Sequence, residues 1–176
     1  MLSSIMLFAL QVSNLTTAEP TCRPVDSAVV RQHATKIIEH PDSPEATLNY
    51  SALVEYWRSQ CASSRYNASE DTVRALSLLL RSPLDISGAS RMLYEIGDNL
   101  GHAIPALEEA LEKEILFRQN LRDEQMRARP FVALYSSGLS DGPINDLRCI
   151  LNKARTGTCD AALCEDIAEA NNGDNN

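Results

Sequence analysis

Positive charge is scarce in this sequence of 176 residues, which has 16 Lys and Arg against 24 Asp and Glu and a formal net charge of −8. Proteins that bind nucleic acids through the phosphate backbone need clustered Lys and Arg. No basic residue follows Arg155, whereas five acidic residues do, so much of the negative charge lies at the C-terminal end. The charge therefore argues against a nucleic-acid partner, and residues 159–176 are expected to form an acidic, partly disordered tail.

Long apolar runs are also missing. The uncharged apolar run at residues 2–12 is much shorter than the roughly 20 residues of a membrane-spanning helix. It is followed by Thr16-Thr17-Ala18, small residues after which signal peptidase could cleave. A signal peptide usually begins with a positively charged region, but no Lys or Arg precedes Arg23. The alternative is a buried N-terminal helix or a chain whose true start lies upstream. We interpret residues 1–18 as a signal peptide. We accordingly expect a secreted, periplasmic or lumenal protein with no membrane span after cleavage.

Cysteine is absent between residues 62 and 148, so the five cysteines form two clusters. Their proximity in sequence favours a Cys22–Cys61 disulfide and a second disulfide between Cys149 and either Cys159 or Cys164. Because the number of cysteines is odd, one thiol must stay free or form a disulfide with another chain. A zinc site is the alternative, but the sequence has no Cys-x-x-Cys pair and no His after His102. We therefore expect disulfides, and neither a metal nor a cofactor.

Strand patterns are nearly absent, with Phe131–Tyr135 as the single candidate, whereas apolar residues recur at helical spacing along the chain. The pattern predicts an all-α domain over residues 19–158 with about six helices. These helices would be stacked as hairpins, in a short α-solenoid or an irregular helical bundle. The expected helices cover residues 26–40, 45–63, 69–81, 86–98, 104–128 and 143–155, with a short addition at 160–170.

One segment carries a recognisable pattern. Ser90-Arg-Met-Leu-Tyr-Glu-Ile-Gly-Asp98, followed by Ala103-Ile-Pro-Ala-Leu107, resembles HEAT-type helical repeats. In those repeats a helix commonly ends in an Ile-Gly-Asp-like turn, and the next helix opens with an Ile-Pro-x-Leu-like stretch. The turn here is longer, because residues 99–102 are inserted. The resemblance covers residues 70–114 and implies stacked helical hairpins.

Catalytic motifs are few. Gly138-Leu-Ser140-Asp-Gly142 matches Gly-x-Ser-x-Gly, but that nucleophile elbow requires parallel strands and a later His. We interpret it as a loop that leads into a helix, and we assign no catalytic residue. A small secreted hydrolase that uses acidic residues remains an alternative, with Glu95, Glu108 and Glu112 as its first candidates.

Aromatic residues are rare, at 5% of the sequence, yet four of them fall between residues 50 and 66. Tyr50, Trp57 and Tyr66 either pack in a core beneath a Cys22–Cys61 disulfide or contact a partner, since Trp and Tyr are enriched in binding hot spots. Our leading hypothesis is an exported, non-catalytic protein that binds another protein. Inhibitor, immunity-type and chaperone-cofactor roles fit this hypothesis. A carrier of a small apolar ligand is a further alternative.

Overall fold

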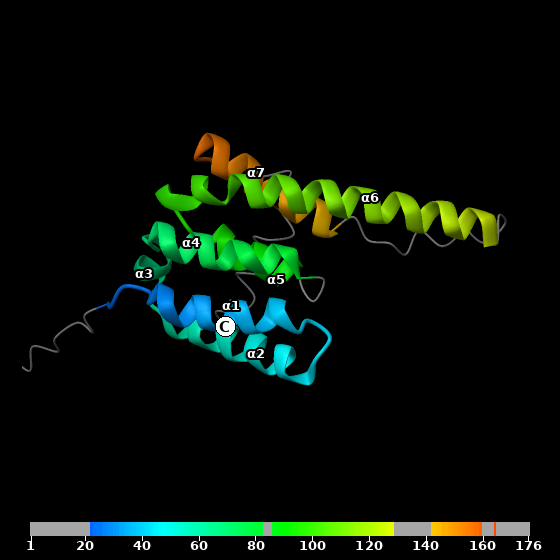
Figure 1. Ribbon diagram of the computed structural model, residues 1–176. Helices are drawn as coiled ribbons and strands as arrows, with labels where there is room; N and C mark the ends of the chain where they lie inside the picture. Colours follow the sequence, from blue (N-terminus) through cyan, green and yellow to red (C-terminus); the bar gives the residue numbers. More distant parts are fainter. Residues whose placement is uncertain (1–21, 83–85, 129–141, 160–163, 165–176) are drawn as a thin grey trace, which may run out of the picture.

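The computed structural model describes residues 22–82, 86–128, 142–159 and Cys164 (Figure 1). All regular secondary structure in these ranges is helical, comprising seven α-helices and two 3₁₀-helices. The all-α prediction is confirmed. The predicted signal peptide, the candidate strand at 131–135 and Ser140 lie outside the described residues, as does the predicted short helix at 160–170 apart from Cys164. Among the helices that are described, none has the length and apolar character to cross a membrane.

The first layer is a helical hairpin of α1 (Ser27–Glu39) and α2 (Pro44–Ser59). Asp26 caps α1 by accepting a hydrogen bond from the Ala28 amide, and Ser43 caps α2 by accepting one from Ala46. The amide of Asp26 donates to the Tyr56 hydroxyl at 2.8 Å, which ties the start of α1 to the end of α2. Capping side chains and Pro44 in the first turn therefore set the hairpin where the sequence predicts it.

The second predicted helix, 45–63, is divided in the structure. α2 ends at Ser59, Gln60 and Cys61 are extended, and α3 (Ala62–Tyr66) follows. The guanidinium of Arg65 donates to the Gln60 carbonyl oxygen at 2.6 Å. This side chain thus gives the Gln60 carbonyl the hydrogen bond that a backbone amide would give it in a continuous helix. Cys61 is also bonded to Cys22 at this break. The predicted continuous helix was wrong because these contacts, which local periodicity does not encode, stabilise the break.

The middle layer consists of α4 (Glu70–Ser77), the 3₁₀-helix η1 (Leu78–Arg81) and α5 (Ile86–Tyr94). α5 ends at Tyr94, four residues before the predicted end. The amide of Gly97 instead donates to the carbonyl oxygen of Tyr66 at 2.8 Å. This bond joins the turn after α5 to α3. It takes the place of the bond that the Gly97 amide would make in a continuous helix, so α5 ends early.

The third layer begins with the 3₁₀-helix η2 (Asp98–Ala103), which occupies the predicted break. It continues with α6 (Ile104–Ala128) and α7 (Gly142–Thr156). Figure 1 shows the layers one above another, with α1 and α2 at one side, α4 and α5 between, and α6 and α7 at the other. This arrangement agrees with the predicted stacking of helical hairpins.

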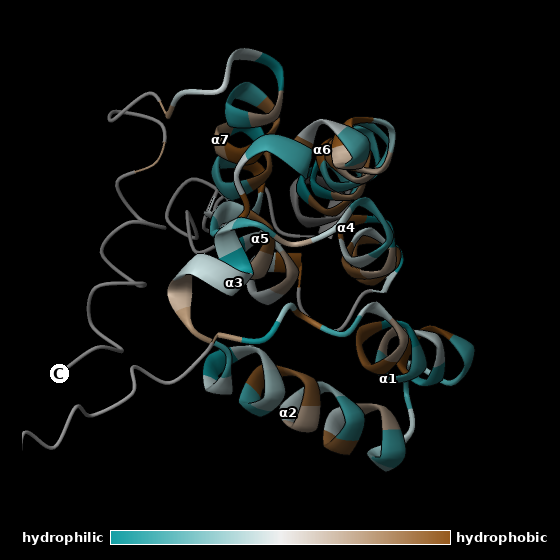
Figure 2. Ribbon diagram, turned by 90° about the vertical axis from the view of Figure 1, so that its left-hand side faces the viewer, coloured by the Kyte–Doolittle hydropathy of each residue, from teal (hydrophilic) through white to brown (hydrophobic). Residues whose placement is uncertain are grey.

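The core runs through all three layers. Figure 2, in which α6 is seen nearly end-on, shows apolar faces turned toward neighbouring helices and polar faces turned outward. Each large apolar side chain that is fully buried contributes about 1.5–3 kcal/mol to the free energy of unfolding. The largest of these side chains include Ile37, Leu53, Leu76, Leu79, Leu93, Ile96, Leu107, Leu147 and Ile150.

Two leucines on α2 provide a matched test of this core. Leu53 is fully buried, whereas Leu48 is 70% exposed. We expect Leu53→Ala to lower the free energy of unfolding by about 2–5 kcal/mol, because it leaves a cavity. We expect Leu48→Ala to change it by less than about 0.5 kcal/mol. Urea denaturation followed by circular dichroism measures both, and equal effects would contradict the described packing of α2.

Candidate functional site

The disulfide framework joins Cys22 to Cys61 and Cys149 to Cys164, and leaves Cys159 as an exposed thiol. The first predicted disulfide is confirmed. The second is one of the two pairings that the sequence left open. Cys164 belongs to the segment predicted as an acidic tail, yet it is buried and bonded to α7.

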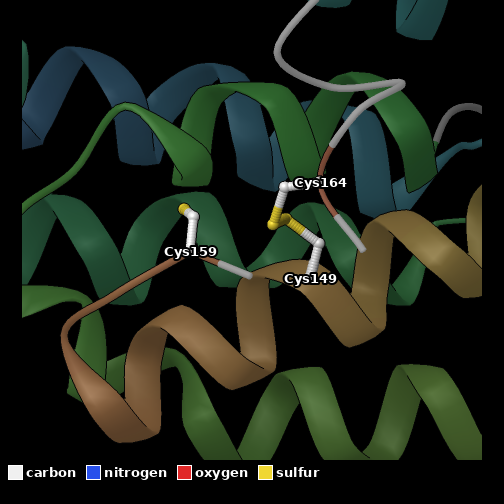
Figure 3. A group of neighbouring side chains, drawn as sticks. All are labelled: Cys149, Cys159 and Cys164. Atoms are coloured by element: carbon white, nitrogen blue, oxygen red, sulfur yellow. A yellow bond between two sulfur atoms is a disulfide. The ribbon is translucent and has the colours of Figure 1, made fainter. Parts of the chain in front are cut away.

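Cys149, Cys159 and Cys164 form a sulfur cluster, in which the three sulfur atoms lie within 4.8 Å of one another (Figure 3). The end of α7 explains why Cys159 reaches the disulfide. Gly157 has a φ of +75°, the left-handed conformation that glycine adopts readily after a helix. Its amide donates to the Lys153 carbonyl oxygen at 2.8 Å. The chain thus turns back, and Cys159 lies beside a disulfide formed about two helical turns earlier in α7.

Tyr94 and Lys153 surround the free thiol. The pKa of Tyr94 is raised to about 12, first by hydrogen bonding with Cys159, then by burial and then by the negative charge of the Cys159 thiolate. Lys153 donates to the Tyr94 carbonyl oxygen, and its ammonium lies 4.7 Å from the centre of the Tyr94 ring. Burial lowers the pKa of Lys153, while the charges of Cys159 and Glu95 oppose that shift. The thiol therefore has a hydroxyl donor and a cation as neighbours.

Cysteine sulfur is a common zinc ligand, but it binds zinc as the deprotonated thiolate. Cys149 and Cys164 are bonded to each other, so their sulfur atoms carry no thiolate in this form of the chain. One thiol remains, and it does not make a zinc site. The chemistry that the disulfide-bonded cluster supports is exchange between a thiol and a disulfide.

The three aromatic residues named as partner contacts do not form one surface. Trp57 is only 2% exposed, and Tyr50 is partly buried against the same core. Trp57 cannot contact a partner while this fold is intact, so its role is the core packing that we gave as the alternative. Tyr66 is 51% exposed, and its ring covers Gly97, where an added Cβ would lie 2.5 Å from a ring carbon.

Two apolar residues that the sequence did not lead us to expect at the surface are exposed. Leu116 and Phe117, here named the α6 apolar pair, are 57% and 56% exposed. Figure 1 shows the C-terminal part of α6 extending past the ends of α4 and α5. The signal was present in the sequence, because both residues fall off the helical stripe of Ile104, Leu107 and Leu111 that predicts the core face.

The acidic residues of the hydrolase alternative lie in structural ion pairs or at the surface. Glu108 accepts from Arg155 at 2.5 Å, which links α6 to α7, and Glu95 is paired with Arg65. Glu112 is exposed on α6. The two ion pairs, Glu108 with Arg155 and Glu95 with Arg65, join elements that are distant in sequence. A structural role therefore accounts for these two carboxylates.

A recess of about 200 Å³ lies between the α4–η1 segment and the start of α6. Its charged groups are already partnered, since Arg74 pairs with Glu70 and the Arg81 guanidinium lies 3.9 Å from Glu109. An apolar ligand requires a mostly apolar lining. Four titratable side chains, those of Arg74, Arg81, His102 and Glu109, line this recess, which does not favour it as the site of an apolar ligand. Its lining residues are Arg74, Ser77, Leu78, Arg81, His102, Pro105, Ala106 and Glu109.

The link between Tyr94 and Cys159 predicts a measurable titration. In the native chain we expect the Tyr94 hydroxyl to be half ionised at a pH of about 12, which is its raised pKa. In Cys159→Ala its pKa should fall toward the ordinary value of 10.0, because the hydrogen bond and the thiolate charge are both removed. The ¹³C shift of the Tyr94 Cζ, assigned with Tyr94→Phe, reports this ionisation. An identical titration in Cys159→Ala would contradict the contact.

Comparison of the chain with family models, curated proteins and solved structures gave no match. The function is therefore inferred from the surfaces and the chemistry described above.

Proposed function

We propose that this chain is an exported, non-catalytic helical protein that acts by binding another protein. The observation that carries the proposal is the α6 apolar pair. Scattered apolar residues are common on protein surfaces, but Leu116 and Phe117 are adjacent on a helix that extends beyond the middle layer (Figure 1).

The surroundings of the pair fit a protein interface. Exposed polar residues flank it on α6, Lys113 on one side and Gln119 and Asn120 on the other. Interfaces combine an apolar centre, enriched in aromatic residues, with a polar rim. A partner that presents a complementary apolar groove would bury Phe117 and Leu116 together, and burial of an aromatic side chain is a common source of binding energy.

The disulfides support export. Disulfides persist in oxidising compartments, whereas cytosolic thiols are kept reduced. Cys22 and Cys61 connect the segment before α1 to the break between α2 and α3. A bond of this kind stabilises a fold by about 2–4 kcal/mol. Inhibitor, immunity-type and chaperone-cofactor roles share the requirement for an exported, stable binding surface.

Substitution of the α6 apolar pair tests the binding proposal. We expect a chain of residues 19–176 to capture a specific partner from its native compartment, and the Leu116→Ser/Phe117→Ser variant to lose it. With the purified partner, the Kd should rise about 30-fold or more, which corresponds to a hot-spot loss of about 2 kcal/mol. Biolayer interferometry measures this change.

Leu48→Ser is the matched control, because it removes an exposed leucine from α2 instead of α6. It should bind like the native chain, and circular dichroism should show that both variants remain helical. Equal binding by the native chain and the α6 variant, or failure of the native chain to capture any specific partner, would contradict the proposal.

Export makes a separate prediction about native material. Peptide mapping without reduction should recover a Cys22–Cys61 bond, because an oxidising compartment maintains it. The control is the same protein reduced before mapping. Five free thiols in material alkylated at the moment of lysis would contradict export.

A further inference from the structure

We propose that Cys159 exchanges with the Cys149–Cys164 disulfide and so transfers this buried bond to the protein surface, where a thiol from solution reduces it. This reactive site is separate from the α6 apolar pair.

The first argument is proximity. The sulfur atom of Cys159 lies within 4.8 Å of both sulfur atoms of the disulfide, which is anchored to α7 through Cys149. Thiol–disulfide exchange requires a thiolate to approach one sulfur of a disulfide directly. This attack requires a side-chain rotation at Cys159 and a small shift of the turn after α7 to close the distance.

The second argument is access. Cys149 is fully buried and Cys164 is 2% exposed, so a thiol in solution cannot reach either sulfur in the folded chain. Cys159 is exposed and is the member of the cluster that solvent contacts. Exchange through Cys159 therefore offers a path between the buried disulfide and solution that does not require unfolding.

The third argument is the placement of the thiol. Tyr94 and Lys153 both lie beside the thiol, since Cys159 influences the pKa of each of these two side chains. Lys153 is itself anchored to the Tyr94 carbonyl oxygen. These contacts come from α5 and α7, so two packed helices position the thiol beside the disulfide.

The reaction balances without an added oxidant. Cys159 first gives its proton to water, and its thiolate then attacks Cys164 or Cys149. A new disulfide forms as the Cys149–Cys164 bond breaks, and the released cysteine takes up a proton. One thiol and one disulfide are present before and after this step.

Reduction then follows at the surface. The thiolate of a small thiol such as glutathione attacks Cys159, which forms a mixed disulfide and releases the second cysteine of the buried pair. A second glutathione attacks the mixed disulfide, which yields oxidised glutathione and restores the Cys159 thiol. The two electrons that reduce Cys149 and Cys164 thus come from two glutathione molecules.

Reduction kinetics test the proposal, with reduced glutathione as the probe and the full native chain as the substrate. Cys159→Ser should slow reduction of Cys149–Cys164 about tenfold or more, because the accessible sulfur is removed. The Cys22–Cys61 bond is the internal control, since Cys22 is exposed and its rate should be the same in both proteins. Equal rates at Cys149–Cys164 in the native chain and the variant would overturn the proposal.

Mapping of the intermediate gives a second test that needs no variant. Reaction samples are quenched with acid and alkylated, then digested with trypsin and Asp-N. This digestion separates the three cysteines, because Lys153 and Arg155 follow Cys149 and Asp160 directly follows Cys159. The expected first adduct is glutathione on Cys159, with Cys149 and Cys164 both alkylated. A first adduct on Cys149 or Cys164 would overturn the proposal.

Discussion

Burial of the middle layer on both faces is the interaction on which the other features of this fold depend. α4 packs against α1 on one side, and α5 packs against α7 on the other. Leu76, Leu79, Leu93 and Ile96 are all buried there. Because the hydrophobic effect scales with the apolar area removed from water, this layer holds the two outer helix pairs together. The positions of α6 and of the sulfur cluster follow from that packing.

Packing on the middle layer also explains why reactive groups meet at the end of α7. Tyr94 is the last residue of α5, and Lys153 lies in the last turn of α7. The contact between α5 and α7 brings them together, and the left-handed Gly157 then returns the chain so that Cys159 lies beside them. A surface thiol, a buried disulfide and a cation, all from residues 149–164, thus share one site with Tyr94, which comes from a distant part of the chain.

Much of the secondary structure could be predicted, because helix signals are local. The range predicted for α6 agrees with the structure, and Ser69 caps α4 through the amide of Thr72. The errors lie where distant contacts override local preference. α2 ends early beside the Cys22–Cys61 bond, and α5 ends early because Gly97 bonds to Tyr66. Both contacts involve residues remote in sequence, which periodicity cannot reveal.

The sequence by itself determined the helical class and most helix boundaries, because spacing and capping residues carry that information, and the sparse cysteines favoured the Cys22–Cys61 pairing. Only the tertiary structure decided that Cys164, and not Cys159, pairs with Cys149. It also decided that Trp57 is buried while Leu116 and Phe117 are exposed. Burial depends on which helix faces meet across the layers. A sequence states which residues are apolar, but the packing of distant helices determines which of them water can reach.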